Sequence, residues 1–263
     1  MFGYSVLQDL DEDESCGIIV LDSTDPETNV THTYLGKCVK KLATNAEEVL
    51  ALKKEGDLLE YVKGGPFIVN LHAKHENDDY FLLVLDMFEL QDLQILSQTQ
   101  DFFEDEVKFI GAELVVAFEY LHSIGVAHTC VKMENVGVDY EGHIAVLDFD
   151  ESERYDLSEE DPEMIERRKY REESDWYCLG HTLHTLLTRD DPRWYQDGSI
   201  ELTWYPNYCS VEALDFLNAL LFGDPDLRLG VGGAIALKQH PFFEGIDWDE
   251  VRMRTAIPPA SLI

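Results

Sequence analysis

Basic residues are scarce in this sequence, where 20 lysines and arginines face 53 aspartates and glutamates, for a formal net charge of −33. A surface with this imbalance repels nucleic acid and anionic membranes and attracts proteins that carry positive charge. We therefore expect no nucleic-acid partner and no membrane partner. A protein with a basic face is the expected partner, docking through contacts that weaken as salt is added.

Cysteine pairs, long apolar runs and a targeting segment are also missing. No C-x-x-C pair occurs, which argues against a zinc site and against a disulfide framework. No run of 18 apolar residues exists and the N-terminus soon turns acidic, so neither a transmembrane helix nor a signal peptide is expected. A reducing compartment, cytoplasmic or nuclear, fits this pattern. The cysteines are odd in number and widely spaced: Cys16, Cys38, Cys130, Cys178 and Cys209.

What is present suffices for a sizeable core, since hydrophobic residues make up 45% of the chain and aromatic residues 11%. Short apolar runs with β-branched residues predict strands at 17–21, 34–39, 68–71 and 80–87. Helical spacing of apolar residues predicts helices at 46–62, 104–123, 176–187 and 211–221, with a hairpin of short strands at 136–138 and 144–146. The chain thus reads as α+β, with a small β-rich part at 1–88 and a large helical part at 89–263.

Four segments carry a resemblance to a known family. The segment 120–135, with its core His128-Thr129-Cys130, resembles the H-R-D-L-x-x-x-N catalytic loop of eukaryotic protein kinases. Asp148-Phe149-Asp150 follows at the place of D-F-G, and 174–180 looks like the start of the central helix of the large kinase lobe. Residues 224–230, 240–243 and 246–248 are similar to the end of that lobe in the A/G/C serine/threonine group, which includes ribosomal S6 kinase and protein kinase B relatives.

The resemblance covers nearly the whole chain in the right order, and it implies one bilobal protein kinase-like domain. It also implies roles for individual residues in phosphoryl transfer. Lys37 matches the lysine that pairs with a helix glutamate, for which Glu55 is the expected partner and Glu47 or Glu48 are competitors. The remaining implied roles are a catalytic-loop lysine at Lys132, metal ligands at Asn135 and Asp148, and a structural salt bridge between Glu163 and Arg228.

Several positions depart from the family pattern. Cys130 stands where the catalytic aspartate belongs, and a thiol with a pKa of about 8.5 is mostly neutral at pH 7 and does not replace a carboxylate base. A nucleophilic role for Cys130 is the less favoured reading, because no histidine–carboxylate pair can be placed beside it. Thr129 replaces the arginine that clamps a phosphorylated activation segment in the family, which argues against such regulation here. The segment from Asp148 to the A-P-E-like 161–163 is also short.

The phosphate-binding loop departs furthest. The G-x-G-x-x-G place is taken by 11–16, which begins with four carboxylates and contains no glycine. A like-charge pair at ~4 Å costs about 1 kcal/mol in water and about 4 kcal/mol at an effective dielectric near ~20. In the adenine pocket, Leu35 replaces a small alanine and Gly137 a large apolar residue, so we expect Leu35 to fill part of that space. Magnesium–ATP binding is therefore expected to be weak or absent, and no cofactor to be required.

The folding skeleton, in contrast, looks retained. Leu59, Leu71, His128 and Phe149 match the apolar column that joins the lobes of an active-like kinase, anchored by Asp175. Keeping this column while losing the glycine loop favours a catalytically impaired homologue, a pseudokinase that binds proteins as a scaffold or allosteric regulator. An active kinase or its substrate is a candidate partner.

Two alternatives stay open. In the first, the chain is a serine/threonine kinase with residual or non-standard ATP-dependent phosphotransfer, in which Asp150 supplies a second carboxylate beside Asp148. In the second, the chain is part of a longer regulator, since the family usually continues beyond the position of Pro258-Pro259 into a tail that wraps the small lobe.

Overall fold

The computed structural model describes residues 3–9, 16–25, 27–42, 44–88, 91–201 and 209–263. The chain divides into two compact units, of which the first contains Met1–Gly64, Ile68–Leu90 and Asp148–Asp150. The second contains Gly65–Phe67, Gln91–Leu147 and Glu151–Ile263. The first unit therefore includes three residues from far along the chain, which a division at residue 88 assigns to the other part.

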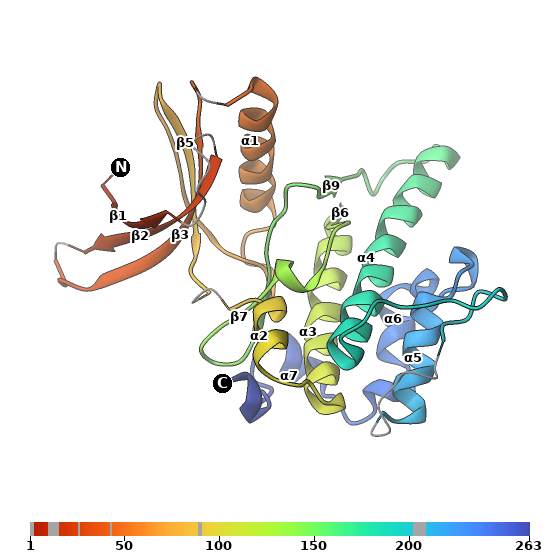
Figure 1. Ribbon diagram of the computed structural model, residues 1–263. Helices are drawn as coiled ribbons and strands as arrows, with labels where there is room; N and C mark the ends of the chain where they lie inside the picture. The colour runs from red at the N-terminus through yellow and green to blue at the C-terminus, as the bar shows by residue number, and fades with distance from the viewer. Residues whose placement is uncertain (1–2, 10–15, 26, 43, 89–90, 202–208) are drawn as a thin grey trace. The chain divides into compact units, whose positions relative to one another are not determined.

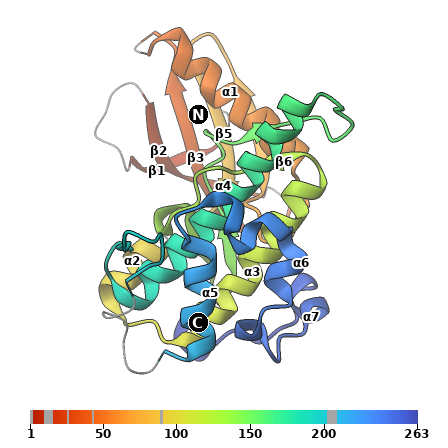
Figure 2. The same ribbon diagram turned by 90° about the vertical axis from the view of Figure 1, so that its right-hand side faces the viewer.

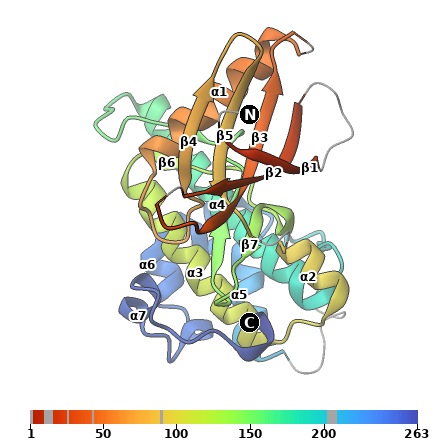
Figure 3. The same cartoon turned by 90° about the vertical axis from the view of Figure 1, so that its left-hand side faces the viewer.

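A five-stranded antiparallel sheet of order β1-β2-β3-β5-β4 forms the first unit (Figure 3). Its strands β2 and β3 extend beyond the predicted runs, and β4 begins at the last residue of the predicted strand 68–71. Polar residues follow Leu71 in β4, so the apolar run marked only the entry to this strand. The strands are β1 (Ser5–Asp9), β2 (Cys16–Thr24), β3 (Thr31–Lys40), β4 (Leu71–Glu76) and β5 (Tyr80–Asp86).

The two faces of this sheet have different neighbours. Helix α1 (Ala46–Tyr61) contacts β3, β4 and β5 on one face of the sheet (Figure 1). Asn45 caps the start of this helix, since its side chain accepts hydrogen bonds from the amides of Glu47 and Glu48. The other face carries a small core that includes Ile19 and Leu21. Gly36 lies in the middle of this core, and a Cβ there would come within 2.8 Å of both side chains, so the sheet requires glycine at this position.

Helices dominate the second unit, and Figure 2 shows α3, α4, α5 and α6 gathered together. The helices are α2 (Leu93–Thr99), α3 (Glu104–Ser123), α4 (Pro162–Thr188), α5 (Val211–Leu221), α6 (Gly233–Lys238) and α7 (Trp248–Arg252). Short strands are β6 (Val126–Ala127), β7 (Val136–Val138), β8 (Ile144–Val146) and β9 (Glu153–Arg154). Single turns are η1 (Met133–Asn135), η3 (Pro225–Leu227), η4 (Leu229–Gly232), η5 (Pro241–Phe243) and η6 (Ala260–Leu262).

The core of the second unit surrounds α3, which is buried on almost every side between Val107 and Leu121. Aromatic rings pack at its border, where Phe118 meets Trp176 edge to face and Phe216 stacks on Phe242. Within the described ranges, no helix combines the length and the apolar character that a membrane span needs.

Helix α4 begins 14 residues before the predicted start at 176. Asp161 caps its first amides and Pro162 occupies the first turn, a combination that starts a helix without an apolar stripe. Residues 162–172 are exposed or half-buried, so hydrophobic periodicity gives no signal there. The result is one continuous helix of 27 residues whose second half is buried.

Candidate functional site

Lys37 forms the centre of an ionic cluster in the first unit. Its Nζ lies 2.7 Å from Glu55 Oε1 and 2.5 Å from Asp148 Oδ1. The Glu55 side chain is 2% exposed, whereas that of Asp148 is 34% exposed. The expected ion pair between Lys37 and Glu55 is thus present, and Asp148 joins it as a second carboxylate.

Burial and charge act in opposite directions on this cluster. Burial alone would lower the pKa of Lys37, but the charges of Glu55 and Asp148 outweigh burial and raise it above the usual value. Burial raises the pKa of Glu55, and the Lys37 charge offsets this only in part. Lys37 is therefore held as a cation between two carboxylates.

Local structure explains why Glu55, and neither competitor, meets Lys37. Glu47 and Glu48 lie in the first turn of α1, where the Glu48 side chain accepts a hydrogen bond from Asn45 at 2.7 Å. Glu55 lies on the buried face of the same helix and also accepts a hydrogen bond from the Phe149 amide at 3.2 Å. This second bond fixes the backbone that follows Asp148, whose φ is 59°.

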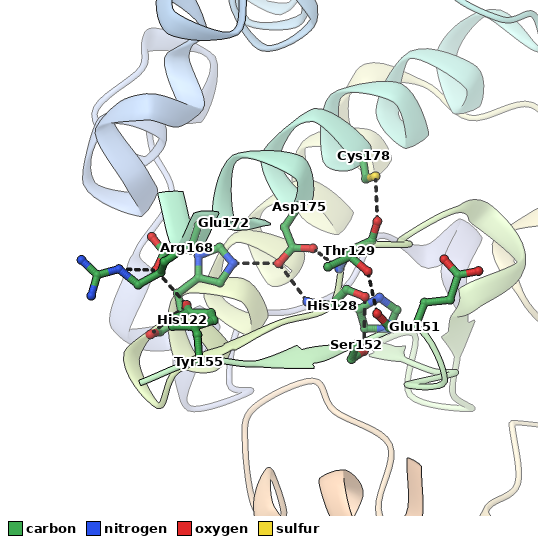
Figure 4. Close-up of polar contacts among 10 residues, drawn as sticks. All are labelled: His122, His128, Thr129, Glu151, Ser152, Tyr155, Arg168, Glu172, Asp175 and Cys178. Atoms are coloured by element: carbon green, nitrogen blue, oxygen red, sulfur yellow. Dashed lines mark hydrogen bonds and ion pairs between the residues drawn. The ribbon is translucent and has the colours of Figure 1, made fainter. Parts of the chain in front are cut away.

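Asp175 fixes the backbone of the loop after β6 in the second unit (Figure 4). It is fully buried on α4 and accepts hydrogen bonds from the amides of His128 at 3.0 Å and Thr129 at 2.6 Å. His122 Nε2 lies 2.7 Å from the same carboxylate. Thr129 has a φ of 66°, an unusual conformation that these bonds hold in place.

The rest of this loop is held by Asn135, which is buried and donates from Nδ2 to the Cys130 carbonyl at 2.8 Å. The Leu147 amide donates to the Asn135 carbonyl, also at 2.8 Å. Cys130 itself is half-buried, and Lys132 forms an exposed ion pair with Glu134. The loop that resembles a catalytic loop is therefore held by backbone hydrogen bonds to two buried side chains, Asp175 and Asn135.

Hydroxyl groups connect this loop to the segment after Asp150. Thr129 Oγ1 donates to the Glu151 carbonyl at 2.9 Å, and Ser152 Oγ donates to the His128 carbonyl at 3.2 Å (Figure 4). Strands β6 and β9 pair just beyond these bonds. Only neutral hydroxyl and carbonyl groups form these links, and one of them comes from Thr129, which stands at the arginine position of the family motif.

Tyr155 ties the same segment to α4. Its hydroxyl donates to Glu172 Oε1 at 2.7 Å, and burial together with the Glu172 charge raises the pKa of Tyr155 far above its usual value. The hydroxyl consequently stays protonated as a donor over the whole physiological pH range.

The predicted salt bridge between Glu163 and Arg228 is wrong. Arg228 pairs with Glu173 at 2.6 Å, and the side chains of the two are 14% and 8% exposed. Glu163 pairs with Arg167 on the surface and is 75% exposed. The cause is the early start of α4, because a continuous helix places Glu163 in its first turn and brings Glu173, ten residues later, next to Arg228 at the end of η3.

Other predicted residues lie in separate units or outside the described ranges. Lys37, Glu55 and Asp148 belong to the first unit, and Lys132 and Asn135 to the second. Leu35 and Gly137 are divided in the same way, so the prediction about the adenine space stays a prediction. The acidic segment lies outside the described residues apart from the backbone of Cys16, which begins β2.

The residues of the predicted apolar column are buried. Leu59, Leu71 and Phe149 are 1–3% exposed in the first unit, and His128 and Asp175 are fully buried in the second. Among the residues that the structure describes, no cluster of three or more histidine, cysteine or acidic side chains suits a metal ion.

Comparison with known proteins agrees with this architecture. The protein kinase domain family matches residues 26–243, so the chain belongs to the protein kinase domain family. Among its members, the chain is 32% identical over 263 residues to ribosomal protein S6 kinase 2 alpha of Gallus gallus, which covers 92% of this chain and 35% of that protein. It is 33% identical over 248 residues to ribosomal protein S6 kinase alpha-3 of Homo sapiens, covering 86% and 33%.

A probable serine/threonine-protein kinase of Dictyostelium discoideum is 31% identical over 247 residues, which cover 86% of this chain and 54% of that protein. The chain therefore spans between a third and about half of the length of these relatives. The predicted likeness to the A/G/C group is confirmed at the level of the domain.

Proposed function

We propose that this chain is a catalytically impaired protein kinase homologue that acts by binding another protein. The observation that carries the proposal is Cys130, which occupies the place of the catalytic aspartate in a loop whose backbone is held by Asp175 and Asn135. A thiol is mostly protonated near neutral pH and makes a poor general base beside a substrate hydroxyl. In this proposal the loop has a fixed backbone but lacks the carboxylate that would deprotonate a substrate.

A binding role agrees with the rest of the molecule. The buried core of each unit and the Lys37–Glu55 pair indicate a folded protein kinase-like domain, and the net charge of −33 favours a partner with a basic face. An active kinase or its substrate that carries a basic face would be such a partner. Residence in the cytoplasm or nucleus remains part of this proposal.

The cluster of Lys37, Glu55 and Asp148 favours a second candidate, a kinase with residual or non-standard ATP-dependent phosphotransfer. In that case the role implied for Asn135 and for Asp148 would be that of a magnesium ligand, since amide and carboxylate oxygens are donors that this ion accepts. The ion would neutralise phosphate charge, while Lys37 would bind the phosphates and Asp150 would add a carboxylate. The acidic segment 11–14 opposes nucleotide binding, so magnesium–ATP binding is weak or absent in our proposal.

A thermal-shift titration with ATP, in the absence and presence of magnesium or manganese, tests nucleotide loading. Lys37→Met is the matched control, since it removes the cation that would contact the phosphates. We expect little or no shift at millimolar ATP. The expected Kd for ATP lies well above this concentration, and a ligand far below its Kd stabilises the fold very little.

Transfer of the γ-phosphate to a basic protein such as a histone, followed with radiolabelled ATP, tests catalysis directly. We expect no transfer above the background of the Lys37→Met variant. Metal-dependent transfer by the wild-type chain that Lys37→Met abolishes would overturn the proposal and establish the second candidate.

A further inference from the structure

A small pocket lies beside the first half of α4 in the second unit. It has a volume of about 230 Å³ and is lined by Glu166, Lys169, Tyr170 and Glu173 of α4 and by Pro225 and Asp226 of η3. Sites for small molecules and cofactors occupy about 300–1,000 Å³. This pocket is smaller, and its size suits one side chain of another protein.

Helix α4 already holds one guanidinium group next to this pocket. Arg228 pairs with Glu173 at 2.6 Å, and its guanidinium carbon lies 4.4 Å from the centre of the Tyr177 ring. Glu173 and Tyr177 are four residues apart, so their side chains are neighbours on the helix surface. A glutamate and a tyrosine at this spacing thus form a site for an arginine, with an ion pair on one side and a ring face on the other.

The same pair of residue types occurs seven residues earlier on α4. Glu166 and Tyr170 are again four residues apart, and seven residues make two turns, so this pair lies on the same side of the helix roughly 10 Å away. Both residues line the pocket, and Tyr170 is 65% exposed. In the described part of the chain, no ion pair engages Glu166.

A competing cation is present but weakly held. Lys169 lines the pocket and lies 3.5 Å from Asp226, in a pair whose side chains are 52% and 85% exposed. Exposed pairs of this kind contribute little to stability. An incoming guanidinium can therefore take Asp226 as a further partner while Lys169 turns to solvent.

We propose that this pocket binds an arginine side chain from a basic segment of a partner protein, stacked on Tyr170 and paired with Glu166. The planar guanidinium suits this geometry better than an ammonium group, because it can stack and donate hydrogen bonds at once. The overall charge of −33 draws such a segment towards the chain. The assignment deepens the proposed binding role and holds whether or not the chain transfers phosphate.

Fluorescence anisotropy with a labelled peptide tests this site. The probe is a flexible glycine–serine peptide with two lysines and one central arginine, compared with peptides that carry lysine or citrulline at the centre. We expect the wild-type chain to bind the citrulline peptide about tenfold more weakly, since citrulline keeps the shape of arginine but loses its charge. The lysine peptide should fall between the two.

Substitutions on α4 locate the effect. Glu166→Gln should raise the Kd of the arginine peptide about tenfold and Tyr170→Leu about threefold. Glu163→Gln is the matched control, because it removes the same charge three residues away from an exposed position outside the pocket. We expect it to change the Kd less than twofold, and all three variants should melt within about 2 °C of the wild type.

Two results would overturn the assignment. One is equal weakening by Glu166→Gln and Glu163→Gln with no preference for arginine, which would indicate attraction to the acidic surface as a whole. The other is binding that ignores both Glu166 and Tyr170, or no binding at all. Phosphate transfer by the wild-type chain would instead refute the proposed function and leave the pocket assignment intact.

Discussion

The pairing of Arg228 with Glu173 provides the sharpest test of the structure, because the resemblance to the kinase family selects Glu163 for the same role. We compare Glu173→Gln with Glu163→Gln, two substitutions that remove one carboxylate charge each from α4. The side chain of Glu173 is 8% exposed and that of Glu163 is 75% exposed. The two positions therefore predict very different losses.

Removing one partner of a buried ion pair costs about 3–5 kcal/mol, since the other charge is left buried without compensation. Glutamine can still accept a hydrogen bond from Arg228, so we take the lower end, about 3 kcal/mol. For a chain of this size each kcal/mol lowers Tm by about 2–4 °C, which gives a drop of roughly 6–12 °C for Glu173→Gln. An exposed pair with i,i+4 spacing contributes about 0.3–0.5 kcal/mol, so Glu163→Gln should lower Tm by less than about 2 °C.

Differential scanning calorimetry of the two variants measures these shifts, and urea unfolding checks them. The single variant Arg228→Met and the double variant Glu173→Gln/Arg228→Met complete a cycle, and the double variant should be more stable than Glu173→Gln alone because it removes the buried charge that lost its partner. Equal shifts for Glu173→Gln and Glu163→Gln, or a larger shift for Glu163→Gln, would refute the pairing and restore the arrangement that the sequence predicts.

Three further predictions concern pH, the loop and the sheet. Burial lowers the pKa of His184 from 6.5 to about 4, so the unfolded chain takes up the proton first and the free energy of unfolding falls as the pH drops from 6.5 towards 4. At pH ~5 this loss is about 2 kcal/mol. Urea unfolding should show the loss in the wild type and not in His184→Gln. Asp175→Asn should expose the 126–135 backbone to hydrogen exchange and destabilise the chain by about 2–3 kcal/mol, since it removes a charged acceptor of two buried amides; unchanged exchange there would contradict the anchoring role. Gly36→Val should lower the free energy of unfolding by about 1–3 kcal/mol, because its Cβ meets two side chains at 2.8 Å, and an unchanged urea midpoint would contradict this.

Secondary structure was predictable where burial gives a periodic pattern. The predicted bounds of α3 and α5 agree with the structure, because apolar residues mark one side or more of each helix along its whole length. The first half of α4 was missed because it is exposed and lacks such a pattern. The only sequence signals for its true start are Asp161 and Pro162, and the resemblance to the kinase family assigned these two residues to the A-P-E-like motif.

Pairs of residues were predictable where a motif defines both partners, as for Lys37 and Glu55. The hydrogen bonds from Thr129 and Ser152 were not predictable. Serine and threonine hydroxyls donate to backbone carbonyls in many contexts, and no sequence spacing indicates which carbonyl accepts. The buried pair of Glu113 and His143, 2.5 Å apart, was missed for a different reason. Its partners are 30 residues apart in sequence and only the fold brings them together.

Two neutral hydrogen bonds join the 126–135 loop to the segment after Asp150, and they have a consequence for how the proposed binding activity is regulated. Hydrogen bonds from Thr129 and Ser152 to carbonyl groups form as the chain folds, and they need neither an added phosphate nor a clamping arginine. They are also insensitive to ionic strength, unlike a phosphate–arginine clamp. Under the proposed binding role, each folded copy would carry the loop in the same shape, so synthesis and degradation, and not kinases and phosphatases acting on this segment, would control how many copies can engage a partner.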